Sequence, residues 1–324
     1  MAQVIEPSLP GRMPSRPLTD EDLRSPRQRR VMLPVVLFIV TCLSTFFAGA
    51  SGWLPDIVIG RIWNSGNLMP LRMMIVRGWD NGLIYMTCVL AILLTHEMGH
   101  FIATIRYRIA ASLPYFIPFP FTPFGTMGAV IGMDGLKANR KQLFDIGLAG
   151  PLAGLVVAVP VLWIGIMKLD LSVNGHGAMA FHCPLLARWL MAFLNPAGYA
   201  GQKEIWMSQI NPYFMAGWVG LLITGLNMMP VSQLDGGHVI YTLFGRRAHW
   251  IARGFLLLAI VFIVFGEAHH WILMVMLVMF IGTDHPPTSN DRMLLGRFRS
   301  LLGWTSLAIP VLCFPPHVLT IVGR

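Results

Sequence analysis

Charged residues are scarce in this sequence of 324 residues. Asp, Glu, Lys and Arg make up 12% of the chain, whereas soluble domains carry about 25%. Hydrophobic residues make up 55% of the chain, and its mean hydropathy is +0.63. This composition excludes an ordinary soluble domain and indicates a membrane protein.

Cysteine is also scarce, and none of the four cysteines has a partner nearby in the sequence. Cys42, Cys88 and Cys313 fall in apolar segments, and Cys183 stands alone in a polar loop. The sequence therefore indicates neither a disulfide framework nor a cysteine-based zinc site. It also lacks internal repeats, which disfavours a transporter built from inverted repeats.

Several apolar runs are long enough to cross a bilayer, which takes about 20 residues. They are residues 31–52, 82–105, 144–168, 212–230 and 250–268, with weaker candidates at 270–283 and 300–321. The sequence therefore predicts an all-α polytopic membrane protein with about six to seven transmembrane helices.

The net charge of +9 is unevenly distributed along the chain. Lys and Arg are concentrated in the N-terminal tail and in alternate loops, which is the positive-inside pattern of membrane proteins. We therefore expect the N-terminus and the basic loops to be cytoplasmic. No basic patch interleaved with aromatic residues is present, so nucleic acid is not an expected partner.

The composition suggests three regions. Residues 1–30 are polar and rich in Pro and Arg, which predicts a disordered cytoplasmic tail. Residues 31–284 form the predicted membrane core, and residues 285–324 form a C-terminal segment that could contain an extra transmembrane helix. No organelle transit peptide is evident before the first apolar run, which favours the bacterial plasma membrane over an organelle.

The segment LLTHEMGHFIAT, residues 93–104, places three ionisable side chains in an apolar run. An ionisable group at the centre of a transmembrane helix costs about 2.5–3.5 kcal/mol on insertion scales, so a cluster of them needs a functional reason. His96 and His100 are four residues apart and share one helix face, where two imidazoles can bind one ion. Glu97 is offset around the helix and can reach a water bound to that ion. This H-E-x-x-H pattern is typical of zinc peptidases.

A catalytic zinc usually has three protein ligands and an open position for water, so a third ligand is expected from another helix. Asp235, in GLNMMPVSQLDGGHVIY (residues 225–241), is the candidate. The segments that carry the histidines and Asp235 both run toward pairs of arginines, so the charge rule places all three side chains near the cytoplasmic face. The arginine pairs are Arg106 with Arg108, and Arg246 with Arg247.

Other interpretations of these residues remain open at this point. The polar groups could line a cavity in a membrane metal-ion or proton transporter, although such a path would need ionisable groups on several more helices. An inactive metal-binding membrane protein is another alternative, although it would not need Glu97. Asp235 alone could be a turn residue before Gly236 and Gly237.

The motifs HEMGH and NMMPVSQLDGG together resemble the site-2 protease family of intramembrane zinc metalloproteases, which pairs HExxH with N-x-x-P-x-x-x-L-D-G. Three other stretches are similar to the same family. SLPYFIPFPFTPFGTMGAVIGM (112–133) resembles its membrane re-entrant strand region, FDIGLAGPLAGL (144–155) its core helix, and DHPPT (284–288) the ending of its chloroplast-type branch. The resemblance covers residues 82–290.

The resemblance implies that His96, His100 and Asp235 bind one Zn2+ per chain and that Glu97 is the general base. It implies that Asn227 contacts the substrate backbone or the oxyanion, although a membrane Asn can also simply bridge helices. The expected activity is regulated intramembrane proteolysis of a single-pass membrane protein within the lipid bilayer. His238 is expected to be a polar neighbour of the zinc rather than a fourth ligand, because water needs that position.

A substrate helix must unwind before its peptide bonds can be attacked, because its backbone groups are hydrogen-bonded internally. A host strand would stabilise the extended form, and GTMGAVI (125–131) is the candidate, with an ordinary re-entrant loop as the alternative. The candidate substrate-binding residues are Gly125, Gly128, Asn227 and Pro230. Gly147, Gly150 and Gly154 are expected to permit close helix packing.

The stretch between residues 169 and 211 is too short for the PDZ domain that many relatives carry, and no CBS pair is evident, so we expect a branch without these domains. The histidines and the cysteine of this stretch, His176, His182 and Cys183, are expected to be solvated.

Overall fold

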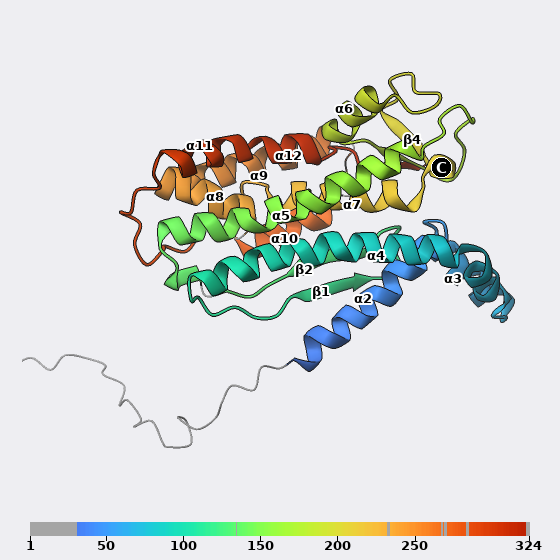
Figure 1. Cartoon of the computed structure of the whole chain (residues 1–324), viewed down its shortest axis with the longest axis horizontal. Helices are drawn as coiled ribbons and strands as arrows, with labels where there is room; N and C mark the ends of the chain where they lie inside the picture. Colours follow the sequence, from blue (N-terminus) through green and yellow to red (C-terminus); the bar gives the residue numbers. More distant parts are fainter. Residues whose placement is uncertain are drawn as a thin grey trace, which may run out of the picture.

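Two long apolar helices, α4 (Met69–Arg106) and α5 (Arg140–Met167), run side by side through the centre of the protein (Figure 1). The computed structural model describes residues 31–133, 135–231, 234–266, 268, 271–282 and 285–321. Within these residues the protein is mostly helical, as predicted. The predicted disordered tail, residues 1–30, lies outside the described residues.

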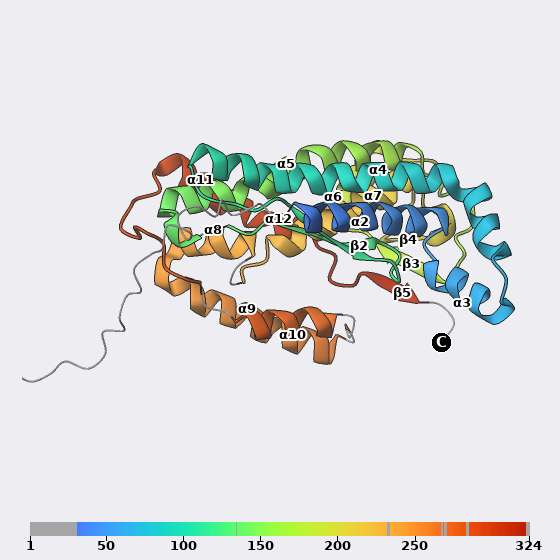
Figure 2. The same cartoon turned by 90° about the horizontal axis from the view of Figure 1, so that it is seen from below.

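Shorter elements surround this pair. The described helices also include α2 (Met32–Ala50), α3 (Pro55–Ser65), α6 (Leu185–Leu194), α7 (Pro212–Asn227), α8 (Asp235–Phe244), α9 (Ala248–Phe265), α10 (Ile272–Ile281), α11 (Arg297–Ser306) and α12 (Ala308–Cys313). The strands are β1 (Tyr115–Phe119), β2 (Gly125–Val130), β3 (Met179–His182), β4 (Glu204–Trp206) and β5 (Leu319–Ile321). Figure 2 shows α9 and α10 diverging from the layer that contains α4 and α5.

Within the described residues, four helical stretches are long and apolar enough to cross a membrane. They are α2, α4, α5 and the run Asp235–Phe265, which combines α8 and α9. Helix α4 has 38 residues, and at about 1.5 Å per residue it is longer than the bilayer core of about 30 Å. The structure thus supports a polytopic membrane protein, and the total of six to seven spans stays a prediction.

Helix α7 is the most enclosed of the described helices, although its 16 residues are too few to meet the length expected of a membrane span. It begins at Asn211, whose side chain accepts a hydrogen bond from Phe214 N at 3.0 Å, followed by Pro212 at the first helical position. Helices α4, α5 and α12 pack against it, and Trp218 is fully buried. This central helix ends at Asn227 and so delivers that side chain to the predicted site.

The start of α5 is set by a capping box. The Asn139 side chain accepts hydrogen bonds from the backbone of Lys141 and Gln142, and the Gln142 side chain accepts one from Asn139 N. Arg140 donates to the carbonyl oxygens of Thr242 and Leu243 at the end of α8. These bonds fix where α5 begins and hold it against α8.

Strands β1 and β2 form an antiparallel hairpin in the region predicted to be a re-entrant strand or loop. The Ser44 hydroxyl of α2 donates to the Gly125 carbonyl at 2.5 Å, and the Tyr85 hydroxyl of α4 donates to the Phe124 carbonyl at 2.7 Å. Gly125 has a φ of +72° and lies too close to the α2 backbone for a side chain. Among the described residues β2 pairs only with β1, so its other edge is open.

A second sheet, which the sequence did not predict, lies at the other end of α7. Strand β3 pairs with both β4 and β5, and the Trp218 indole donates to the carbonyl oxygen of His182 at 2.7 Å. The prediction that His182 and Cys183 are solvated is wrong, because Cys183 is 7% exposed and His182 is half-buried. The pairing of a loop with residues from the chain's far end causes this burial, and His176 alone is exposed.

Candidate metal centre

His96 and His100 lie one turn apart on the face of α4 that packs against α5. The glycines predicted for close packing leave room for these two imidazoles. A Cβ at Gly154 would lie 3.0 Å from His96 Nδ1, and a Cβ at Gly150 would overlap the His100 ring. The small residues of α5 therefore serve the site directly, because larger ones would displace the histidines.

The orientation of the His100 ring is set by a backbone group of α5. His100 Nδ1 lies 2.7 Å from the carbonyl oxygen of Ile146. A carbonyl can only accept, so Nδ1 carries the proton and Nε2 of the neutral ring keeps its lone pair. Such a bond to the second ring nitrogen is the usual way in which proteins orient a metal-binding histidine.

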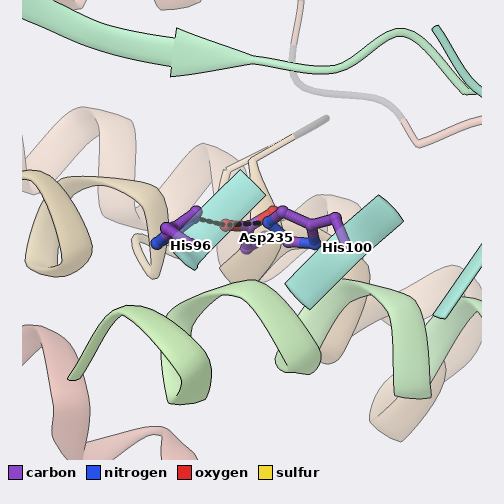
Figure 3. Close-up of side chains that lie close together, drawn as sticks. All are labelled: His96, His100 and Asp235. Atoms are coloured by element: carbon purple, nitrogen blue, oxygen red, sulfur yellow. Dashed lines mark hydrogen bonds and ion pairs between the residues drawn. The ribbon is translucent and has the colours of Figure 1, made fainter. Parts of the chain in front are cut away.

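Asp235 is the first residue of α8, and its carboxylate lies between the two imidazoles (Figure 3). Its Oδ2 is 3.2 Å from His96 Nε2 and 3.3 Å from His100 Nε2. Any side chain at Gly236 would overlap the Met228 carbonyl oxygen at the end of α7. This glycine therefore allows α8 to start close to α7 and brings Asp235 to the histidines.

The spacing of these atoms fits a zinc ion. In a tetrahedral site, bonds of about 2.0–2.1 Å place the ligand atoms about 3.3 Å apart, which agrees with the two distances to Asp235 Oδ2. The three side chains can offer one ligand atom each, all within 4.8 Å of one another. Two imidazoles and one carboxylate also form a donor set that zinc enzymes use. His96 Nδ1 is buried without a hydrogen-bond partner among the described residues.

A cavity of about 490 Å³ opens beside these three side chains. Glu97 and Asn227 both line it, and Glu97 is only 3% exposed. The side-chain nitrogen of Asn227 is 3.3 Å from His96 Nε2. The structure thus brings all five predicted catalytic and metal-binding residues to one pocket.

The remaining predicted substrate-binding residues, Gly125, Gly128 and Pro230, do not line this cavity. Part of its wall is formed by residues 129–133, which directly follow Gly128 in the chain. Gly125 packs against α2, whereas a Cβ at Gly128 would face Ile223 of α7. Pro230 lines a neighbouring pocket between α8 and α9.

The site also contains a contact that sequence reasoning missed. His285 Nδ1 lies 2.6 Å from the Pro286 carbonyl oxygen and so donates to it, which leaves Nε2 to accept from His238 Nδ1 at 2.6 Å. Burial lowers the pKa of His285, which favours this neutral ring. Tyr241 stacks on the same imidazole at 4.3 Å. The only signal in the sequence was DHPPT, whose Asp284 lies outside the described residues.

The sequence was also compared with known protein families, and the result is consistent with a metal site at these residues. The sequence matches Peptidase family M50 over residues 84–266, more than half of the chain, and the matched stretch includes both motifs. The chain belongs to peptidase family M50. This confirms the predicted resemblance to site-2 proteases.

The M50 relatives of this chain include plant proteins. It is 32% identical over 231 residues to the probable zinc metalloprotease EGY1, chloroplastic, of Arabidopsis thaliana, covering 67% of this chain and 40% of that protein. It is 35% identical over 162 residues to the EGY1 protein of Oryza sativa subsp. japonica, covering 49% of this chain and 28% of that protein. The chain thus spans less than half the length of these relatives.

Proposed function

We propose that this chain is an intramembrane zinc metalloprotease that cleaves peptide bonds in or near transmembrane segments. The observation that carries the proposal is the meeting of His96, His100 and Asp235 from two apolar helices, with Glu97 beside them in one cavity. The M50 family and the names of the zinc metalloprotease relatives support it.

Each residue of the cavity has a distinct role in this proposal. His96, His100 and Asp235 would hold one zinc ion, which would supply Lewis-acid chemistry and lower the pKa of water. Glu97 accepts the proton of the attacking water and later returns it to the leaving amine. The Asn227 side-chain amide donates to the oxyanion that develops on the substrate carbonyl.

The substrate would be a single-pass membrane protein whose cleaved segment is held in an extended form. Strand β2 has an open edge, and residues 129–133 continue from it into the wall of the cavity. Ser112 N donates to the Gly132 carbonyl at 2.8 Å on the β1 side. Because backbone groups alternate along a strand, those of the neighbouring Ile131 face the open edge, where a substrate strand could add.

The charges at one end of the bundle support a proposed placement in the membrane. Arg106 and Arg140 are at the ends of α4 and α5 that lie near the site, and Arg246 follows α8. We place this end, the N-terminus and the active site on the cytoplasmic side of a bacterial plasma membrane. The names of the relatives make a chloroplast membrane the alternative.

Labelling of single cysteines at positions 246 and 201 with an impermeant maleimide in right-side-out vesicles tests the orientation. The assignment would be reversed if only position 246 reacted.

Six to seven helices would span the membrane in this arrangement. They are α2, α4, α5, α7, the α8–α9 run and α10, with α11–α12 as the seventh. Residues 31–284 would form the protease core and the hairpin β1–β2 its re-entrant part. His285 and Pro286, from the C-terminal segment, line the same cavity as the core residues.

Comparison of the natural protein with Glu97→Gln in detergent tests the proposal. We expect about one zinc per chain in both proteins, and cleavage of a transmembrane reporter only by the natural protein, with a loss of roughly 10²–10⁴-fold in the variant. Glu204→Gln, in β4, is the control and should keep full activity. Zinc without cleavage of any reporter in a panel would indicate an inactive metal-binding protein, and absence of zinc would favour a transporter.

A further inference from the structure

Three polar side chains join α4, α5 and α11 close to the metal centre. Arg299 donates from Nε to Asp145 Oδ1 at 2.8 Å and from Nη2 to Asp145 Oδ2 at 2.8 Å. The Tyr107 hydroxyl donates to the same Oδ2. One carboxylate of α5 thus accepts a bidentate pair from α11 and a third hydrogen bond from the end of α4. Arg299 lies beyond the matched M50 stretch.

This cluster lies at the helix contact that orients His100. Asp145 directly precedes Ile146, whose carbonyl oxygen accepts the His100 Nδ1 proton. Tyr107 follows His100 by seven residues, which is two helical turns, so both side chains are on the face of α4 that meets α5. Any rotation of the first turns of α5 about their axis would move the Ile146 carbonyl and with it the His100 ring.

The bonds at the start of α5 divide into two groups. The capping box and Arg140 fix the first residues of the helix and tie them to α8. The bond from Tyr107 to Asp145 instead ties α5 to α4, and Arg299 holds the carboxylate that accepts it. The pKa of Tyr107 is raised by burial and by its hydrogen bond to Asp145, so the hydroxyl stays a donor at physiological pH.

The geometry of the ion pair restrains the relative orientation of the Arg299 and Asp145 side chains. The guanidinium fork of Arg299 matches both carboxylate oxygens, which fixes the angle as well as the distance between the groups. The side chains are 35% exposed for Arg299 and 24% exposed for Asp145. A single exposed lysine would supply the charge without this angular restraint.

We propose that Arg299, acting through Asp145, is a positioning residue of the metal centre. It holds the start of α5 so that the Ile146 carbonyl keeps His100 Nε2 directed at Asp235. This inference rests on the proposed function, because it concerns how well the three side chains hold a metal ion.

The test compares Arg299→Met with Arg297→Met in the full chain. Both substitutions remove one positive charge from α11, and Arg297 is exposed. The measurements are the dissociation constant and visible spectrum of bound Co2+, kcat and KM on a transmembrane reporter, and Tm. We expect Arg299→Met to weaken Co2+ binding about tenfold and to lower kcat about tenfold. This is the low end of the effect of substituting residues that orient a metal ligand. KM should stay within about twofold, and Arg297→Met should match the natural protein.

Two milder variants keep the test decisive if Arg299→Met does not fold. Arg299→Lys keeps the charge but loses the fork, and Asp145→Asn keeps the shape of the side chain. Both should fold, and both should fall between the natural protein and Arg299→Met in Co2+ affinity and kcat. A changed Co2+ spectrum in these variants would support displacement of His100, since loss of a purely structural bridge would leave the spectrum unchanged.

The inference is overturned if Arg299→Met equals Arg297→Met in Co2+ affinity and kcat, or if Tm alone falls. If the natural protein binds Co2+ but cuts no reporter, the proposed protease activity fails while Co2+ affinity still decides the role of Arg299. If the natural protein binds neither Co2+ nor Zn2+, both the proposed function and this inference fail.

Discussion

Gly150 of α5 faces the His100 imidazole so closely that a methyl group on its Cα would overlap Nε2. The same nitrogen lies 3.3 Å from Asp235 Oδ2. The absence of a side chain at this position is therefore a condition for the three proposed zinc ligands to meet. Because α4 and α5 pack against each other here, a methyl group at this position would push the ring out of its place between the two helices.

Gly150→Ala should consequently displace His100. We expect zinc affinity and kcat/KM to fall by about 10–100-fold and the free energy of unfolding to fall by about 1–3 kcal/mol. Gly254→Ala in α9 is the control, since Gly254 is exposed with open space around it. The control should keep zinc and activity. Zinc titration and reporter cleavage check this, and equal behaviour of the two variants would contradict the proposed role of Gly150.

Asn227 offers a prediction about the oxyanion. Asn227→Ala should lower kcat by roughly 10²–10³-fold with little change in zinc content, because a donor to the developing charge acts in the transition state. Asn174→Ala, in an exposed loop, is the control. Single-turnover cleavage and metal analysis would separate the two roles of Asn227. A loss of zinc in parallel with activity would show that the residue mainly holds His96, from which it is 3.3 Å distant.

The open edge of β2 can be tested at Ile131. Proline lacks the backbone N–H, so Ile131→Pro removes a donor from the edge at which a substrate strand would add. We expect kcat/KM to fall by about tenfold, the equivalent of one lost hydrogen bond of about 1.4 kcal/mol, with unchanged zinc content. Ile131→Val keeps the N–H and should retain activity. If both variants cleave equally well, substrate does not pair with this edge.

The second sheet should respond to pH through His182. Burial and the neighbouring His317 lower the pKa of His182, and these effects outweigh the attraction of Glu204. The unfolded chain, with a His pKa of about 6.5, therefore binds the proton more readily than the folded protein. The contribution of neutral His182 to the free energy of unfolding should be fully present above about pH 6.5. It should be lost as the pH falls from about 6.5 through the lowered pKa of His182 in the folded protein.

His182→Gln should reduce this acid sensitivity. It keeps a polar group facing the Thr320 hydroxyl, which lies 2.9 Å from His182 Nε2, but does not titrate. We expect the drop in Tm between pH 7 and pH 5 to be smaller by about 1–3 °C. His176→Gln, at an exposed position in the loop before β3, should leave the drop unchanged. Identical pH dependence in the two variants would contradict the prediction.

The sequence by itself determined the membrane class, the HExxH face and the third candidate ligand. These conclusions depend on local regularities. An apolar run of sufficient length predicts a membrane-spanning helix. A spacing of four residues places His96 and His100 on one face of a helix, whatever surrounds them. The distant motif around Asp235 could be found because a catalytic zinc site needs a third protein ligand. The positions of the arginines also predict that this motif and the histidines lie on the same side of the membrane.

Tertiary structure decided everything that depends on contacts between segments far apart in the chain. No spacing rule links His238 to His285, Arg299 to Asp145, or β3 to β5. The burial of Cys183 escaped prediction for the same reason, since its surroundings come from the end of the chain as well as from neighbouring loops. Long-range pairing is set by packing and hydrogen bonding of the whole fold, and these become visible only when the helices are assembled.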